Sequence, residues 1–255
     1  MMDAAQCWCV RLDIDPELSY ATLSEDERNR SARFRFERDR RRFVVARGAL
    51  RDLLGRYLDI DPGQIRFVYN AFGKPELHPD IDNEGGLEFN LAHSADLALI
   101  AIARDADVGV DVECIEGRGE SNHADVARSF FSATEVDALS RVPAHLYDQA
   151  FFSCWTMKEA YVKGRGEGLT LPLTSFSVPI TTDPAPAAVR CGRWSLFTLQ
   201  PAPGYIGALA VSAPRIYHNL PCERPHLGLQ RESQRREQLV HHHWRMNERA
   251  ERIAK

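Results

Sequence analysis

The sequence has no hydrophobic run long enough to cross a bilayer, because its longest apolar stretch, Leu97 to Ala103, is only as long as a strand. Its first residues, Met-Met-Asp-Ala-Ala-Gln-Cys, lack the basic start and apolar core of a secretion signal. Six cysteines lie scattered, and Cys7 and Cys9 are too close together for a usual zinc knuckle. These absences predict a cytoplasmic protein with reduced, mostly structural thiols and no membrane partner.

The chain also lacks a large excess of charge of either sign, with 32 Lys and Arg against 36 Asp and Glu, and the formal net charge of −4 argues against general nucleic-acid binding. Arginine is nonetheless concentrated after Ser24-Glu-Asp-Glu27, a Ser-x-x-Glu capping box that predicts the start of a helix. The arginines of this segment are Arg28, Arg30, Arg33, Arg35, Arg38, Arg40, Arg41 and Arg42. They form either a solvated helix face or a phosphate-binding surface, for which their planar side chains are suited.

Two acidic residues alternate with valines in the segment from Val108 to Glu113. This alternation predicts a strand on which Asp111 and Glu113 project from one face, with Val110 and Val112 buried behind them. Two adjacent carboxylates repel each other, which raises a pKa unless a cation lies between them. Magnesium prefers such oxygen ligands and leaves its other positions to water and phosphate, so the pair is a candidate metal site.

A second chemical feature lies between Trp155 and Leu171, where good helix formers are followed by Gly164, Gly166 and Gly168. This composition predicts a helix that ends in a shaped loop. Glu159 and Lys163 are four residues apart and therefore share one face of that helix. An isolated pair of this kind is usually a solvated surface ion pair, but here a third carboxylate would join the two on the strand.

The chain also contains an internal repeat. A second capping box, Ser132 to Glu135, follows the first at an offset of 108, and three further matches share an offset of 109: Asp39 with Asp148, Phe43 with Phe152, and Gly55 with Gly164. A repeat of this length predicts an α+β fold of two similar α/β halves in one chain, each a small sheet packed by helices. In this alignment Leu50 and Leu54 stand where Glu159 and Lys163 stand, so only the second half would be catalytic.

These motifs resemble those of the 4′-phosphopantetheinyl transferases, and the longer, Sfp-type branch is the better match. The two signature motifs are Gly109 to Glu113 and Trp155 to Leu169, and the intervening blocks are Phe72 to Pro75, Phe89 to Ser94 and Phe130 to Glu135. The resemblance covers roughly residues 5–213. It implies two α+β halves packed as a pseudo-dimer with coenzyme A between them, so we expect a monomer.

The resemblance also implies roles for individual residues. Magnesium, with Mn²⁺ as an alternative, would be held by Asp111, Glu113 and Glu159. The catalytic residues would be Glu159 and Lys163, and either one, or a metal-bound water, would accept the proton. The contacts to coenzyme A would come from Arg30, Arg42, Lys74, His93, Lys158 and Lys163. The match at Arg30 is loose, and Arg28 is an alternative to it.

The implied reaction is that of a holo-[acyl-carrier-protein] synthase type enzyme. Phosphopantetheine would pass from coenzyme A to a serine of an acyl or peptidyl carrier protein, and 3′,5′-bisphosphoadenosine would be released. The carrier would serve fatty-acid, polyketide or nonribosomal-peptide biosynthesis. Two alternatives are another magnesium-dependent phosphotransferase and a non-catalytic module that binds carrier protein or coenzyme A, although a module of that kind has no need of a metal triad.

The expected domain organisation follows from the repeat and from composition. Residues 1–107 would form the N-terminal half, with the contacts to the adenine and 3′-phosphate of coenzyme A. Residues 108–213 would form the C-terminal half, with the magnesium site and the catalytic helix. Three strands, Ser175 to Ile180, Arg193 to Leu199 and Tyr205 to Ser212, would close its sheet. Residues 214–255 are charged and poor in apolar residues, which predicts a helical or disordered tail.

Overall fold

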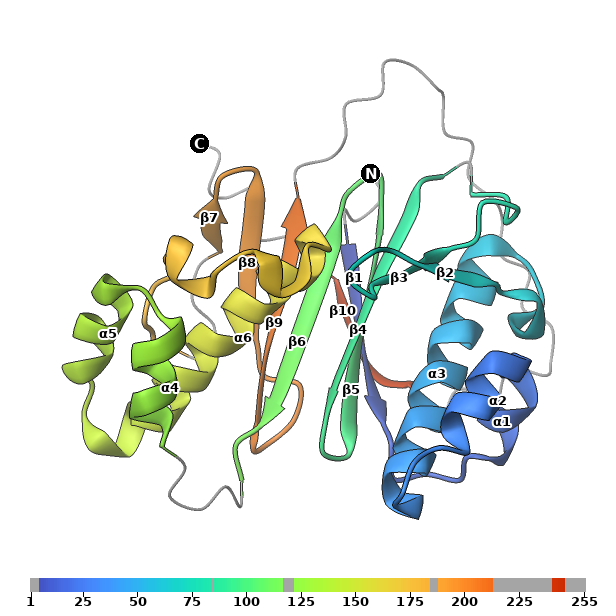
Figure 1. Cartoon of the computed structure of the whole chain (residues 1–255), viewed down its shortest axis with the longest axis horizontal. Coiled ribbons are helices and arrows are strands. Elements are labelled where there is room, and N and C mark those ends of the chain that lie inside the picture. The colour runs from blue at the N-terminus through green and yellow to red at the C-terminus, as the bar shows by residue number, and fades with distance from the viewer. Residues whose placement is uncertain (1–4, 84, 117–121, 184–187, 213–239, 246–255) are drawn as a thin grey trace.

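The computed structural model describes residues 5–83, 85–116, 122–183, 188–212 and 240–245. Two halves lie side by side in Figure 1, each with a sheet whose strands run roughly vertically in the view and helices on its outer side. The predicted α+β architecture of two similar halves is therefore confirmed. No helix in the described part of the chain is both long and apolar enough to cross a membrane.

The N-terminal half contains a four-stranded antiparallel sheet in the order β10-β1-β5-β4, a two-stranded hairpin and three helices. Its strands are β1 (Ala5–Arg11), β2 (Phe67–Tyr69), β3 (Pro75–Leu77), β4 (Leu87–Ser94), β5 (Leu97–Arg104) and β10 (Val240–Arg245). Its helices are α1 (Glu17–Thr22), α2 (Glu25–Ser31) and α3 (Glu37–Leu58), with a 3-10 turn at Pro62–Gln64. Helix α3 packs on the sheet through leucines, and Leu50 and Leu54 are fully buried there.

The C-terminal half repeats this plan with a sheet in the order β6-β9-β8-β7. Its strands are β6 (Val108–Cys114), β7 (Val189–Cys191), β8 (Trp194–Leu199) and β9 (Tyr205–Ser212). Its helices are α4 (His123–Phe130), α5 (Ala133–Ser140) and α6 (Tyr147–Arg165), and 3-10 turns lie at Ala144–Leu146, Gly168–Thr170 and Leu173–Ser175. The order β6-β9-β8 corresponds to β1-β5-β4 of the first half, as duplication of a half requires.

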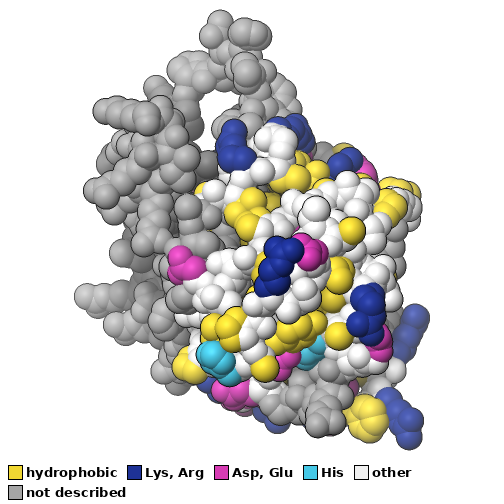
Figure 2. Space-filling model, turned by 90° about the vertical axis from the view of Figure 1, so that its left-hand side faces the viewer, with side chains coloured by type: hydrophobic (Ala, Val, Ile, Leu, Met, Phe, Trp, Pro, Cys, Tyr) yellow, Lys and Arg dark blue, Asp and Glu magenta, His cyan; other side chains and the backbone are white. Residues whose placement is uncertain are grey.

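Both predicted capping boxes are present. In α2 the N-terminal Ser24 pairs reciprocally with Glu27, and in α5 Ser132 pairs in the same way with Glu135. Each pair satisfies amide groups that a helix leaves free at its start. The outer face that α4 and α5 help to form carries scattered Lys and Arg side chains, several of them beside acidic ones, as Figure 2 shows. Arg128 with Asp125 is one such exposed pair.

The two sheets share a core at their junction. Cys7 and Leu99 from the first sheet pack in one buried cluster with Val110 and Leu209 from the second. β4 and β6 lie next to each other across this junction (Figure 1), and the Val110 amide donates to Asn90 Oδ1 at 2.9 Å. The C-terminal half is thus held against the N-terminal half along the strand that carries the predicted acidic pair.

Two expectations from the sequence are wrong. No strand forms at residues 175–180, because Ser175 ends a 3-10 turn and residues 176–180 have no regular secondary structure. The fourth strand of the second sheet is instead β7. Val240–Arg245 was expected to be helical or disordered, but it forms β10, antiparallel to β1, and so belongs to the N-terminal sheet. An exposed edge of β1 offers unpaired backbone groups to such a segment. The predicted hairpin at 182–188 falls partly outside the described residues, as does the rest of the tail.

Candidate active site

Strand β6 presents the acidic pair as its alternation predicts. Val110 and Val112 are buried behind the strand, Asp111 is only 4% exposed, and Glu113 is half-buried. Glu113 Oε2 accepts a hydrogen bond from Ser94 Oγ at 3.0 Å. The prediction missed Ser94, although its place in the β4 motif next to His93 was a usable signal.

Helix α6 lies unusually close to β6 because Gly109 has no side chain. A Cβ at Gly109 would lie 2.0 Å from the Ala160 carbonyl oxygen and 2.3 Å from the Gly164 nitrogen. The helix ends at Gly166, one of the three glycines expected at its end, and the φ of +69° at this residue is the left-handed conformation that favours glycine. This close approach brings Lys163 onto the strand, and its Nζ donates to Asp111 Oδ1 at 2.5 Å.

The three predicted carboxylates influence one another electrostatically. Burial raises the pKa of Asp111 to about 6, the Lys163 ammonium opposes this rise, and the negative charges of Glu113 and Glu159 add to it. Burial also raises the pKa of Glu159, with Lys163 opposing and Glu113 adding to the shift. The single positive charge of Lys163 therefore does not fully offset burial and the neighbouring carboxylates. Raised pKa values are the result expected when carboxylates lie close together.

The N-terminal half contributes His93 and Arg42 from the facing side. The ring of His93 reaches solvent, yet the surrounding protein lowers its pKa, and the positive charges of Lys163 and Arg42 lower it further. Arg42 is held by Asp96, whose Oδ1 lies 2.7 Å from Nη2. His93 and Arg42 of the N-terminal half are thus near enough to Lys163 for their charges to influence one another.

Lys74 reaches the end of α6, whereas Arg30 lies on the exposed surface of α2. Lys74 Nζ donates to the Gly164 carbonyl at 3.1 Å, which ties the β2–β3 turn to the C-terminal end of α6. Lys74 also lines a cavity of about 430 Å³ between the two halves. Arg30 is exposed on α2, and its guanidinium lies 5.3 Å from the centre of the Phe43 ring.

The structure does not bring Lys158 to the site. Its side chain is fully buried, and its Nζ lies 2.8 Å from Glu135 Oε2 while donating to the carbonyls of Leu173 and Phe176. An ammonium group has three N–H donors, and all three of Lys158 point to partners within the protein, so none remains for a phosphate. The predicted contact between Lys158 and coenzyme A is therefore wrong, and Lys158 is a core residue of the C-terminal half.

Asp111, Glu113 and Glu159 offer carboxylate oxygens, the kind of ligand that a hard divalent ion prefers. Among the described residues, no three His, Cys, Asp or Glu side chains are grouped closely enough to hold a metal as they stand. Asp111 Oδ2 is nevertheless buried without a hydrogen-bond partner, while Oδ1 is taken by Lys163. Unpaired buried carboxylate oxygens are costly, and the carboxylate oxygens of Asp111, Glu113 and Glu159 are ligands that suit magnesium. The residues therefore fit the ion once their side chains turn toward it.

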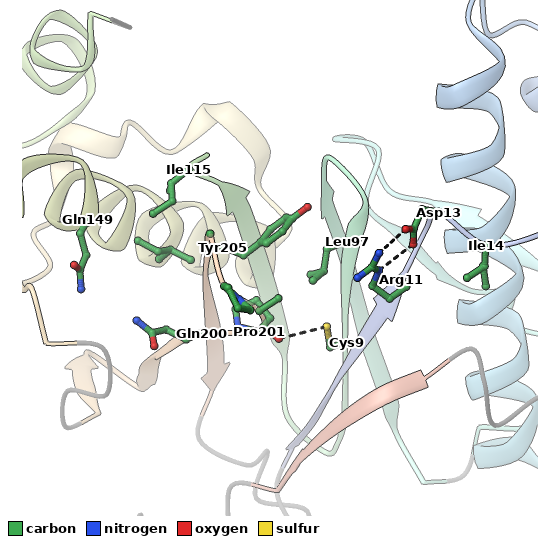
Figure 3. Close-up of a pocket in the computed structure, with 14 residues that line it drawn as sticks. Cys9, Arg11, Asp13, Ile14, Leu97, Ile115, Gln149, Gln200, Pro201 and Tyr205 are labelled. Carbon is green, nitrogen blue, oxygen red and sulfur yellow. Dashed lines mark hydrogen bonds and ion pairs between the residues drawn. The ribbon is translucent and has the colours of Figure 1, made fainter. Parts of the chain in front are cut away.

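A second cavity, larger than the one that Lys74 lines, lies away from these residues. It has a volume of about 1010 Å³ and lies between the halves beside the β8–β9 turn, with Pro201 and Tyr205 on one wall and the paired Arg11 and Asp13 on the other (Figure 3). It contains none of the predicted site residues. Because chemistry depends on the acidic and basic groups and not on volume, the candidate active site is the cluster around Asp111.

Comparison with known proteins gives a consistent result along the chain. Residues 107–210 match the family model of the 4′-phosphopantetheinyl transferase superfamily, and residues 14–105 match that of the 4′-phosphopantetheinyl transferase N-terminal region. The chain is 38% identical to the 4′-phosphopantetheinyl transferase HetI of Nostoc sp. over 227 residues, which cover 86% of this chain and 93% of HetI. It is 30% identical to Sfp of Bacillus subtilis over 161 residues, which cover 63% of this chain and 68% of Sfp.

Proposed function

Because the chain belongs to the 4′-phosphopantetheinyl transferase family and is an enzyme of that type, we propose that it transfers phosphopantetheine from coenzyme A to a serine of an acyl or peptidyl carrier protein. The serine hydroxyl would attack the β-phosphorus of coenzyme A. The bond to the bridging oxygen would break, and 3′,5′-bisphosphoadenosine would leave. The observation that carries this proposal is the cluster of the buried Asp111 with the half-buried Glu113, Glu159 and Lys163, whose charges act on one another and on His93.

Magnesium is the metal that this donor set would take, held by Asp111, Glu113 and Glu159, and Mn²⁺ is an alternative with similar ligands. When bound, it would neutralise charge on the pyrophosphate and on the leaving group. The unpartnered Asp111 Oδ2 supports this assignment.

The proton of the serine needs an acceptor, and we assign that role to Glu159. A pKa raised by burial makes its carboxylate a stronger base than an exposed glutamate. Lys163 would leave Asp111 and contact a phosphate oxygen, for which an ammonium on a flexible chain is suited. Both side chains lie on one face of α6, so a single helix positions base and cation together.

The N-terminal half, residues 1–107, would bind the nucleotide end of coenzyme A. His93 and Arg42 lie near Lys163 and would contact phosphate, and Lys74, whose side chain reaches the end of α6, would add a further cation. Arg30 would reach the 3′-phosphate only by leaving Phe43. Residues 108–213 would carry the metal site and the catalytic helix.

The proposal is tested by intact mass spectrometry of an apo carrier protein incubated with this chain, coenzyme A and magnesium. The expected result is a gain of one phosphopantetheine that disappears with EDTA and with Glu159→Gln. Because the two halves already form the pseudo-dimer interface, we further propose that the chain is a monomer. Light scattering that gives twice the chain mass would contradict that.

A further inference from the structure

The edge of β6 that faces the N-terminal half lacks a strand partner in its own sheet, since β6 is the first strand in the order β6-β9-β8-β7. Two backbone amides along this edge are bound by side chains of β4 instead. The Val110 amide donates to Asn90 Oδ1 at 2.9 Å, and the Cys114 amide donates to Ser94 Oγ at 3.1 Å. Asn90 and Ser94 are four residues apart on β4 and therefore point to the same face.

These two contacts bracket the acidic pair. Val110 directly precedes Asp111 in the sequence, and Cys114 directly follows Glu113. The strand cannot shift along β4 without breaking one of the two hydrogen bonds. The side chains of Asn90 and Ser94 thus fix the register of the acidic strand against the N-terminal half.

Ser94 makes a second contact that the strand edge does not require. While its oxygen accepts from the Cys114 amide, its hydroxyl hydrogen is donated to Glu113 Oε2 at 3.0 Å. A hydroxyl that uses both its donor and its acceptor in this way has one defined orientation. It therefore aims one carboxylate oxygen, Oε2, of Glu113.

We infer that Asn90 and Ser94 are positioning residues through which the N-terminal half sets the geometry of the acidic site in the C-terminal half. This inference rests on the proposed function, in which Glu113 and Asp111 hold a divalent cation. Outer hydrogen bonds that orient metal-binding carboxylates typically change metal affinity by about 10- to 100-fold when they are removed. Each half thus supplies part of one site, although the carboxylates themselves come from the C-terminal half.

The test measures binding of Mg²⁺ and of Mn²⁺ by titration calorimetry to the full chain, without coenzyme or carrier. Ser94→Ala is expected to weaken metal binding about tenfold. Ser94→Thr, which keeps the hydroxyl, is expected to restore it. In the transfer assay Ser94→Ala should raise the metal concentration needed for half-maximal rate by a similar factor while leaving the rate at saturating metal within a few-fold of the original.

Ser212→Ala is the matched control. Ser212 is buried, whereas Ser94 is half-buried, and Ser212 Oγ accepts a hydrogen bond from the Asp107 amide at 2.8 Å, just before the opposite end of β6. This control removes a hydroxyl that caps backbone beside the same strand but contacts neither Asp111 nor Glu113. It is expected to lower the melting temperature while leaving metal affinity unchanged.

The outcomes separate the inference from its premise. Equal metal affinity in Ser94→Ala and the unmodified chain would overturn the positioning role, as would an equal loss in Ser212→Ala. Failure of the unmodified chain to bind Mg²⁺ or Mn²⁺ would remove the metal site itself, and the inference with it. Asn90→Ala is a second test that does not depend on Ser94. It removes the hydrogen bond to the Val110 amide and is expected to weaken metal binding, because that bond helps to hold Asp111 in place.

Discussion

The long helices α3 and α6 occupy corresponding places in the two halves, but they meet their surroundings differently. At the aligned positions α3 carries Leu50 and Leu54, which are fully buried, whereas α6 carries Glu159 and Lys163. Helix α3 packs on its sheet through leucines, and α6 packs through aromatic side chains but approaches β6 closely at Ala160 and Gly164. The repeated plan thus tolerates a change from packing to chemistry at two positions of one helix.

What the halves share is a buried ion pair built on the capping-box glutamate. Glu27 of α2 binds Arg47 and Arg51, and Glu135 of α5 binds Lys158. In each half the pair links a short capped helix to the long helix. The ion pairs that both halves have therefore stabilise the fold. The two positions at which α3 and α6 differ instead contribute residues to the candidate active site.

The largest expected effect tests the position where the halves differ most. Glu159→Gln keeps the size of the side chain but removes the base, so the transfer rate should fall by about 10²- to 10⁴-fold. The melting temperature should stay the same or rise, since burial already disfavours the charged form of Glu159. The measurement is single-turnover transfer together with thermal unfolding.

Leu50→Ala is the matching variant in the N-terminal half. It should lower the free energy of unfolding by about 2–5 kcal/mol and leave the turnover of the folded fraction nearly intact. If Leu50→Ala removed the activity of fully folded protein, or if Glu159→Gln retained full activity, the division between a supporting helix and a catalytic helix would be wrong.

The shared ion pairs give the second prediction. Lys158→Met leaves Glu135 buried without the cation that pairs with it among the described residues, so we expect a loss of about 3–5 kcal/mol in the free energy of unfolding. Arg47→Met should cost less, because Arg51 remains paired with Glu27. Urea unfolding of the two variants checks the order. If Lys158→Met lost less free energy of unfolding than Arg47→Met, the ion pair of the C-terminal half would not support the fold as the pair of the N-terminal half does.

The same ion pair explains one prediction from the sequence that failed. Residues 175–180 alternate like a strand, but the Phe176 carbonyl accepts from Lys158 and the Val178 amide donates to Glu135. Buried side-chain charges thus satisfy backbone groups that a neighbouring strand would otherwise bind. Local alternation cannot reveal such partners, because they lie about twenty and forty residues away in the sequence.

Elements with strong local signals were predicted well. The capping boxes at Ser24 and Ser132, the glycine end of α6 and the acidic strand β6 are all present. Lys158 was misassigned because its neighbour Glu159 borders the site, whereas the turn of the helix points Lys158 into the core. Pairing of β10 with β1 is a long-range contact that the charged tail composition does not indicate.

The third prediction concerns the pH dependence of stability in the metal-free chain, which the acidic site should impose on the C-terminal half. The pKa of Asp111 is about 6 in the folded chain, against an ordinary value of 3.8. The folded state therefore holds this proton more tightly than the unfolded state does. Its contribution to stability is complete below pH 4 and is lost as the pH rises from 4 to 6, a change on the order of 3 kcal/mol.

Asp111→Asn isolates this contribution from those of the other carboxylates. In metal-free buffer the variant should be more stable than the unmodified chain at pH 7, and the difference should shrink toward pH 4. The check is chemical unfolding of both proteins at several pH values with EDTA present. A difference that does not change between pH 4 and pH 7 would contradict the raised pKa of Asp111.

The fourth prediction tests the close contact between α6 and Gly109 of β6. In Gly109→Ala the new methyl group would lie 2.0 Å from the Ala160 carbonyl oxygen, and this backbone atom cannot move without moving the helix. Overpacking of this kind costs about 1–3 kcal/mol. The shift of α6 also carries Lys163 and Glu159 away from Asp111, and a displacement of about 1 Å can reduce a rate about 10²-fold.

Gly63→Ala is the control, since a methyl group there would meet only the Asp61 side chain, at 3.0 Å. It should leave the transfer rate unchanged. In Gly109→Ala the loss of rate should exceed what the loss of folded protein explains, because the small residue sets the distance between helix and strand as well as the packing. A variant that was destabilised but fully active when folded would show that Lys163 and Glu159 tolerate the displacement, and that the small-residue contact contributes only to stability.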